Sequence, residues 1–335
     1  MVFRLLLALG ICIVVGLIWR SKYLSNMVTQ ILILGLYATS LNLLIGYTGM
    51  VSFGHGLFFG AGSYTAGILL QRFDLSPIVG LGASFFVCGI IAGLIAPLCV
   101  RLGSIYFAML TLAFNQLLYV VIIKWSRLTG GDQGLIGGVG ARLLSIDGLK
   151  VDLSDPRSYF TFTLMVVGGC FLLCKLVVNS PFGSIMRAIR ENEQRVHALG
   201  VSVQKCKVIV FMLGGSIGGI SGALMAFFVS GAYPDFAHWV KSAEPIFMIL
   251  TGGMNTLWGP FLGALVLVVV INVTTMFTNL WGLVIGAVIV GVTMGARKGL
   301  GDFFAETFFV SRGEFFKRFE GKLDSGSTQR GRGLR

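Results

Sequence analysis

Two long stretches of this chain contain no acidic or basic side chain. No Asp, Glu, Lys or Arg occurs between Lys22 and Arg72, or between Glu244 and Arg297. Across the chain 12% of the residues are charged, which is about half the share in soluble domains. Backbone groups in hydrocarbon must be hydrogen-bonded internally, so only helices and closed barrels span membranes. Because the apolar runs have the length of spanning helices, the sequence predicts an all-α, polytopic integral membrane protein.

A helix needs about 20 apolar residues to cross a bilayer. Ten candidate spans follow from that rule: 3–19, 27–46, 51–70, 77–100, 103–124, 159–178, 207–230, 258–278, 280–296 and a short one, 244–257. Ten crossings place both termini on one side, and the distribution of Lys and Arg assigns that side to the cytoplasm.

These spans divide the chain into a membrane domain and a tail. We expect residues 1–300 to form the transmembrane domain, with a periplasmic loop at 125–158 that offers a docking surface and a cytoplasmic loop at 179–206. The tail, 301–335, mixes Phe with charges and then becomes basic and polar. It is expected to be a cytoplasmic amphipathic helix followed by a disordered end.

Small residues recur inside the predicted spans. Glycines four residues apart let helix backbones approach closely, and the pairs are Gly56 and Gly60, Gly214 and Gly218, Gly215 and Gly219, Gly218 and Gly222, Gly259 and Gly263, and Gly282 and Gly286. The six cysteines show neither CxxC spacing nor His pairing, which predicts small core residues rather than metal ligands or disulfides. They are Cys12, Cys88, Cys99, Cys170, Cys174 and Cys206.

One of the spans is too rich in glycine for an ordinary lipid-facing helix. The segment 47–64 reads YTGMVSFGHGLFFGAGSY, which predicts a broken or re-entrant segment that lines a cavity. Gly253–Ala264 echoes Gly49–Ala61 with one gap, and either an internal repeat or chance explains this echo.

Polar side chains inside the apolar spans mark a candidate translocation path, because they are costly in hydrocarbon unless satisfied. The candidates are Asn42, Tyr47, Ser52, His55, Thr111, Asn115 and Gln116. His55 is the only histidine at membrane depth, and it is either a proton relay or a structural hydrogen-bonding residue. No Asp or Glu lies within the interior of a span to serve as a partner for a relay.

The most charged passage between the two apolar halves is Ser180–Gly200. Ser180 and Pro181 end the preceding span, and the pattern predicts one helix over 185–199, capped by Gly200. Glu191 and Arg195 stand four apart, in the favourable order for a helical ion pair. A short amphipathic helix with charges of both signs is typical of a segment that docks on a partner protein.

The chain carries no recognisable catalytic motif. It has no HExxH and no Walker GxxxxGK[ST] sequence, so we expect no enzymatic activity and no cofactor bound by this chain. The net charge of +12 is spread over loops and a tail, which favours membrane topology over nucleic-acid binding.

Five blocks resemble the permease subunits of ABC importers for branched-chain amino acids, of the LivM type. They are NLLIGYTGMVSFGHGLFFGAGSYTAG from Asn42, TLAFNQ from Thr111, LTGGDQGL from Leu128, SPFGSIMRAIRENEQRVHALGVSV from Ser180 and GGMNTLWGPFLGA from Gly252. The resemblance implies a ten-helix, multi-pass protein of the bacterial inner membrane. It implies as partners a second related permease, two cytoplasmic ATPases that hold ATP and Mg, a periplasmic substrate-binding protein and membrane lipid.

The same resemblance identifies the charged loop as the element that engages the ATPase. The residues it assigns to coupling are Arg187, Arg190, Glu191, Asn192, Glu193, Arg195, Leu199 and Gly200. Many relatives carry small residues after ENE, where this chain has Gln194, Arg195 and His197, so the coupling consensus is less certain here than the docking geometry.

Other functions stay open from the sequence. The same architecture could import urea, short amides or aromatic acids in place of branched-chain amino acids. A different class would be an ion-coupled secondary transporter or channel, which the absence of intramembrane acids disfavours. A membrane anchor without a transport path is disfavoured by the polar clusters.

Overall fold

The computed structural model describes residues 21–137, 143–146 and 149–277, with the isolated positions 282–284, 286, 287 and 291. The predicted span 3–19, the tail 301–335 and Cys12 lie outside the described residues, as does most of span 280–296. At Gly282 and Gly286, an added Cβ would meet nothing within 4 Å. Among the described residues, no helix therefore packs closely against this pair.

Long helices make up most of the structure. They are α2 (Lys22–Thr48), α3 (His55–Phe73), α4 (Pro77–Cys99), α5 (Ser104–Lys124), α7 (Pro156–Asn179), α10 (Val203–Val229), α11 (Trp239–Gly252) and α12 (Gly259–Phe277). Six of them, all but α3 and α11, are long and apolar enough to cross a membrane, among the residues described. Six predicted spans, from 27–46 to 258–278, coincide with these helices.

Shorter elements connect the long helices. They are α6 (Ser126–Thr129), η1 (Gly131–Gln133), α8 (Pro181–Glu191), α9 (Glu193–Ala198), η2 (Pro234–Ala237), and the strands β1 (Leu135–Ile136), β2 (Leu143–Ile146), β3 (Leu149–Asp152) and β4 (Gly231–Ala232). β1 pairs antiparallel with β4, Leu135 opposite Ala232, and β2 pairs antiparallel with β3, Leu143 opposite Asp152. The helical architecture of the all-α prediction is confirmed, and these strands of two to four residues are exceptions that leave no periodic signal in the sequence.

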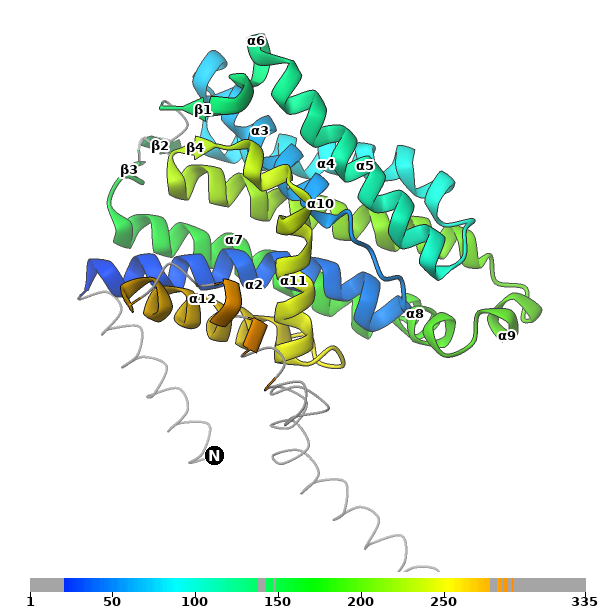
Figure 1. Ribbon diagram of the computed structural model, residues 1–335. Coiled ribbons are helices and arrows are strands. Elements are labelled where there is room, and N and C mark those ends of the chain that lie inside the picture. The colour runs from blue at the N-terminus through cyan, green and yellow to red at the C-terminus, as the bar shows by residue number, and fades with distance from the viewer. Residues whose placement is uncertain are drawn as a thin grey trace, which may run out of the picture.

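α10 is the central helix, and its glycines make this possible (Figure 1). On one face, a Cβ on Gly222 would overlap the Phe59 carbonyl of α3, and a Cβ on Gly214 would lie 3.0 Å from the Ser40 carbonyl oxygen of α2. On another face, a Cβ on Gly219 would lie 2.8 Å from the Cβ of Cys88 in α4. The predicted close packing at these glycines is confirmed, and α10 contacts α2, α3 and α4 at backbone distance.

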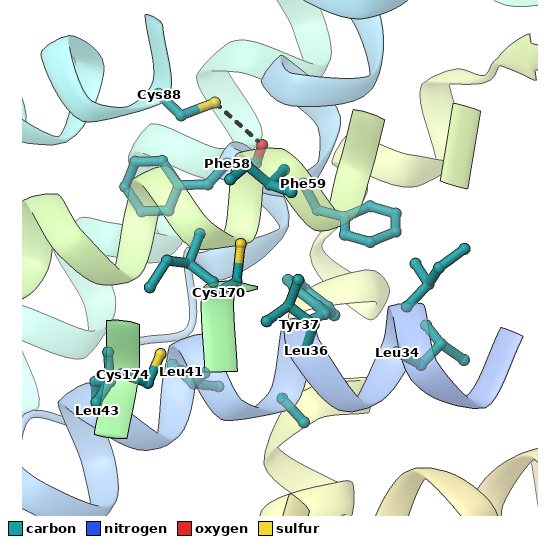
Figure 2. Packing of buried hydrophobic residues seen from close by; sticks show 14 of the residues in the cluster. Leu34, Leu36, Tyr37, Leu41, Leu43, Phe58, Phe59, Cys88, Cys170 and Cys174 are labelled. Atoms are coloured by element: carbon teal, nitrogen blue, oxygen red, sulfur yellow. Dashed lines mark hydrogen bonds between the residues drawn. The ribbon is translucent and has the colours of Figure 1, made fainter. Parts of the chain in front are cut away.

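Large aromatic and aliphatic side chains fill the space that the glycines leave. Tyr37 of α2 packs against Phe59 of α3, with ring centroids 4.5 Å apart, and Phe58 packs edge-on against Phe211 at 5.4 Å. The Cys88 thiol donates to the Phe58 carbonyl at 3.4 Å, as Figure 2 shows. The cysteines at 88, 99, 170, 174 and 206 are free and buried, which confirms the prediction for all that are described.

The segment 47–64 is broken only in its first part. α2 ends with Gly49 at φ 76°, where the Gly49 and Met50 N–H groups bond to the carbonyls of Ile45 and Leu44, a glycine-capped helix end. Residues 49–54 are non-helical, but from His55 the chain is a regular helix. The prediction of a broken helix is wrong there, because α3 is mostly buried and its glycines meet other helices rather than lipid.

The short predicted span, 244–257, is also displaced. The helix α11 begins at Trp239 and ends at Gly252, and residues 253–258 are non-helical. α11 crosses α2, where the Tyr37 hydroxyl donates to the Lys241 carbonyl at 3.1 Å (Figure 1). Lys241 also pairs with Glu244 at 2.6 Å. The helix therefore begins with charged residues, and a prediction from apolar residues alone puts its start too late in the sequence.

The outer faces of α4, α5 and α7 expose large apolar side chains. Examples are Leu94, which is 71% exposed, Ile105, which is 73% exposed, and Leu176, which is 69% exposed. Such a surface is unfavourable in water but suits lipid or another membrane protein. With six candidate spans in the described part, this surface defines a multi-pass membrane protein.

Candidate functional site: a polar core and a charged loop

The polar core forms where the start of α3 lies beside the middle of α2. Ser40 precedes the last residue of α2 by eight positions, or about 12 Å at 1.5 Å per residue. The non-helical residues 49–54 carry the chain back over that distance, so the His55 ring nitrogen Nε2 lies 2.8 Å from the Ser40 hydroxyl. His55 is fully buried and stacks on Tyr37 with ring centroids 5.5 Å apart.

The first turn of α3 also meets the first turn of α11. The Gly56 N–H donates to the Ser242 hydroxyl at 2.8 Å, and a Cβ on Gly56 would lie 3.1 Å from Asn115 Oδ1. Two helix starts and the middle of α5 therefore meet at one point. Ser242 is fully buried but is absent from the predicted set, because it lies between Lys241 and Glu244 and outside any apolar run.

The segment before α3 is held by α5. The Phe53 N–H donates to the Thr111 hydroxyl at 3.3 Å, and that hydroxyl donates to the Ala108 carbonyl at 2.8 Å. The Gly54 N–H donates to the Ser52 hydroxyl at 3.3 Å. The hydroxyls of Thr111 and Ser52 therefore accept hydrogen bonds from backbone N–H groups of an irregular segment. Such groups need a partner inside the protein at membrane depth, because no water is available there.

Five of the seven predicted path residues, Asn42, Ser52, His55, Thr111 and Asn115, are at most 2% exposed, and Tyr47 is 6% exposed. Asn42 lies apart from the His55 group and donates to the Thr256 carbonyl at 3.3 Å. Gln116 is exposed and is not brought together with the others. Whether these residues line a path stays a prediction.

The polar core has unused hydrogen-bonding capacity. Within the described part of the chain, both polar atoms of the Asn115 side chain, Asn42 Oδ1 and His55 Nδ1 are buried without a partner. Each such group costs about 1–3 kcal/mol. His55 forms no ion pair with a carboxylate among the described residues, which favours the structural over the proton-relay interpretation.

The charged loop differs from its prediction in its helical structure. The single helix over 185–199 is wrong, because Asn192 is extended, with φ −159°, and separates α8 from α9. Its side chain caps α9 by accepting from the Arg195 N–H at 3.0 Å. Glu191 and Arg195 are therefore not on one helix, and Glu193 instead pairs with Lys207 at 2.7 Å.

The loop nevertheless presents a charged outer surface. Met186, Ile189 and Val196 are buried, whereas Leu199 is 81% exposed. The exposed positions include Arg187, Glu191, Asn192, Glu193, Arg195 and Gly200. Gly200 has φ 82°, a conformation that favours glycine at the end of a helix, as predicted.

Arg190 lies on the same loop but reaches across to other elements. Its guanidinium donates to the Gly46 carbonyl of α2 and to Asn255 Oδ1, the latter at 3.2 Å. Beside it is a cleft of about 450 Å³ that the end of α2, the connection between α4 and α5, and the α8–α9 loop enclose. Among the described residues, no group of three His, Cys, Asp or Glu is placed to hold a metal ion.

A multi-pass helical bundle with a buried polar core and a charged loop at one end is the architecture of a membrane permease. The family described as "Branched-chain amino acid transport system / permease component" matches residues 23–293. The chain belongs to this family.

Individual relatives agree with the family match. The LivM permease of the high-affinity branched-chain amino acid transport system of Escherichia coli K12 is 28% identical over 265 residues, which cover 71% of this chain and 60% of that protein. In Methanocaldococcus jannaschii, a probable LivM is 25% identical over 286 residues (73% and 80% covered), and a probable LivH is 31% identical over 207 residues (58% and 62% covered). No solved structure matches the chain.

Proposed function

We propose that this chain is a permease subunit of an ATP-powered importer for branched-chain amino acids. The observation that carries the proposal is the family match over 23–293, and the relatives' names supply the cargo. The chain would cross the inner membrane ten times, with both termini and the α8–α9 loop in the cytoplasm, as the distribution of Lys and Arg favours.

The chain would act in a complex of several subunits. A second permease is supported by the resemblance to both LivM and LivH proteins. Two cytoplasmic ATPases would bind ATP and Mg, and a periplasmic protein would deliver the amino acid. The exposed charges of the α8–α9 loop suit a protein partner better than an anionic lipid surface, because acidic and basic side chains alternate there.

The packing of the polar core constrains the mechanism. At Gly54, an added Cβ would overlap the Thr111 carbonyl, and at Gly56 it would lie 2.8 Å from the Ser242 hydroxyl. At these two positions the core has no room for an amino acid in this conformation, so transport through the core would require a second conformation. ATP binding drives that change only if the free-energy difference between the two conformations depends on the nucleotide state.

The proposal is tested by reconstituting the chain with its partner permease, ATPases and binding protein in proteoliposomes. Uptake of labelled leucine should require ATP inside the vesicle and should persist when ionophores collapse the proton and sodium gradients. Uptake that does not depend on ATP and stops when the ionophores are added would identify an ion-coupled transporter instead. Parallel uptake of urea, a short amide and an aromatic acid distinguishes the alternative cargoes.

A further inference from the structure

Two irregular segments of the bundle have the same length and each begins at a glycine with positive φ. Residues 49–54 join α2 to α3, and residues 253–258 join α11 to α12. Each begins with a glycine in the positive-φ region, Gly49 at 76° and Gly253 at 100°. The sequence echo between these regions thus has a structural counterpart, in which a glycine ends one helix and the next helix begins six residues later.

Arg190 is the side chain that contacts both regions. Its guanidinium donates to the Gly46 carbonyl in the last turn of α2, to Asn255 Oδ1 at 3.2 Å and to Met254 Sδ at 3.6 Å. Its Cγ lies 3.4 Å from the position of a Cβ on Gly49. The carbonyls that end a helix carry partial negative charge, so a cation is favourable at this place.

The orientation of Arg190 differs from that of its neighbours on the loop. The side chains of Arg187 and Glu191 are exposed and make no hydrogen bond or ion pair within the described part of the chain. Arg190 is also exposed and lines the 450 Å³ cleft, but it directs its donors at the bundle. The sequence placed all three in one partner-facing set, whereas in the structure Arg190 differs from the other two in bonding to other elements.

We propose that Arg190 is a positioning residue that transmits movement of α8 to both glycine-led segments. This rests on the proposed function, in which a partner ATPase engages the α8–α9 loop. If α8 moves by about 0.5 Å, the 3.2 Å bond to Asn255 passes the length at which a hydrogen bond is lost. Releasing the bonds frees Gly49 and Gly253, whose lack of a side chain lets the backbone change conformation.

The chemistry of the contact requires arginine. The planar guanidinium holds several donors in a fixed fork and so can bond a carbonyl and an amide oxygen at once. A lysine at this position keeps the charge but presents a single ammonium group. The contact therefore predicts that R190K restores only part of the function that R190A loses.

The test uses the reconstituted complex and compares R190A, R190K and N255A with K175A, an exposed cation on α7 that serves as the control. The measurements are retention of the ATPase subunits, ATP hydrolysis stimulated by loaded binding protein, and leucine uptake. In R190A the ATPases should stay bound while the ATP consumed per leucine rises roughly tenfold. N255A should raise it about threefold, and K175A should leave it unchanged.

Each outcome decides the proposal. Loss of the ATPases from R190A would show that Arg190 is a partner contact, and an unchanged ATP-to-leucine ratio would show that it transmits nothing; both overturn the inference. If R190A fails to assemble in the membrane, R190K and N255A carry the test, and normal ratios in both reject it. A wild-type complex without ATP-driven leucine uptake would instead reject the proposed function.

Discussion

Replacing Gly222 with alanine should force α3 and α10 apart. A Cβ at this position would overlap the carbonyl oxygen of Phe59 and would lie 2.7 Å from its carbonyl carbon and 3.0 Å from its Cα. The obstacle is backbone within a helix, so no rotamer change relieves it. The only response open to the structure is a shift of one helix relative to the other.

The size of the effect follows from that shift. An ordinary contact between carbon and oxygen is about 3.3 Å or longer, so the backbones must separate by more than about 1 Å at Gly222. A gap of about 0.5–1 Å already forfeits a quarter to a half of each neighbouring van der Waals contact. Overpacking of a well-packed interior costs about 1–3 kcal/mol, and we expect G222A near the upper end, because rigid backbone opposes the methyl group.

The assay is the free energy of unfolding in mixed detergent micelles, with G169A as the matched control. Gly169 lies inside α7, and a Cβ there would meet nothing within 4 Å. G169A should therefore stabilise the protein by about 0.5–1 kcal/mol, since alanine loses less backbone entropy in a helix than glycine. Equal shifts for the two variants, or a stabilised G222A, would refute the close approach of α3 and α10.

Two further changes test other parts of the site. S40A should destabilise the fold by about 1–3 kcal/mol, because it leaves the buried His55 Nε2 without its partner. The control S63A loses only a bond to Gly60 within its own helix and should destabilise the fold less in the same unfolding titration. Equal losses of stability would contradict the Ser40–His55 pairing. N192A should remove the α9 cap at a cost of about 1 kcal/mol, seen as faster amide hydrogen exchange in α9, whereas N192D should keep the protection; unchanged exchange in N192A would show that the cap does not hold α9.

The helices were the most predictable part of the fold. Spanning helices are predicted from the length and apolarity of their segments, and both properties can be read without knowing what packs against the segment. The course of α3 could not be predicted in this way, because whether a glycine breaks a helix depends on what packs against it. Gly56 and Gly60 stay helical since Ser242 and Ala237 pack on them. Those contacts come from residues far away in the sequence, 186 positions in the case of Gly56 and Ser242.

Part of the polar core could also be predicted from the sequence. Polar residues inside apolar runs are rare enough to stand out, and Asn42, Ser52, His55, Thr111 and Asn115 are indeed buried. Gln116 is a neighbour of Asn115 in sequence, but successive residues on a helix point about 100° apart, so it faces outward.

The sequence of the charged loop contains a capping signal at the break between its two helices. Asn192 precedes Arg195 by three positions, the spacing at which an asparagine caps a helix, and the break between α8 and α9 occurs there. The inward direction of Arg190 had no such signal, because it depends on the C-terminal end of α2 and on the segment 253–258.

The position of α10 has a consequence for how the protein is made. Membrane helices are inserted first and associate afterwards, and α2, α3 and α4 all precede α10 in the chain. α10 packs against all three of those helices, so the core stays incomplete until residues 203–229 have been synthesised and inserted. Nascent chains arrested before α10 should accordingly be recognised by membrane quality control as unassembled, even though most of their apolar helices are already in the bilayer.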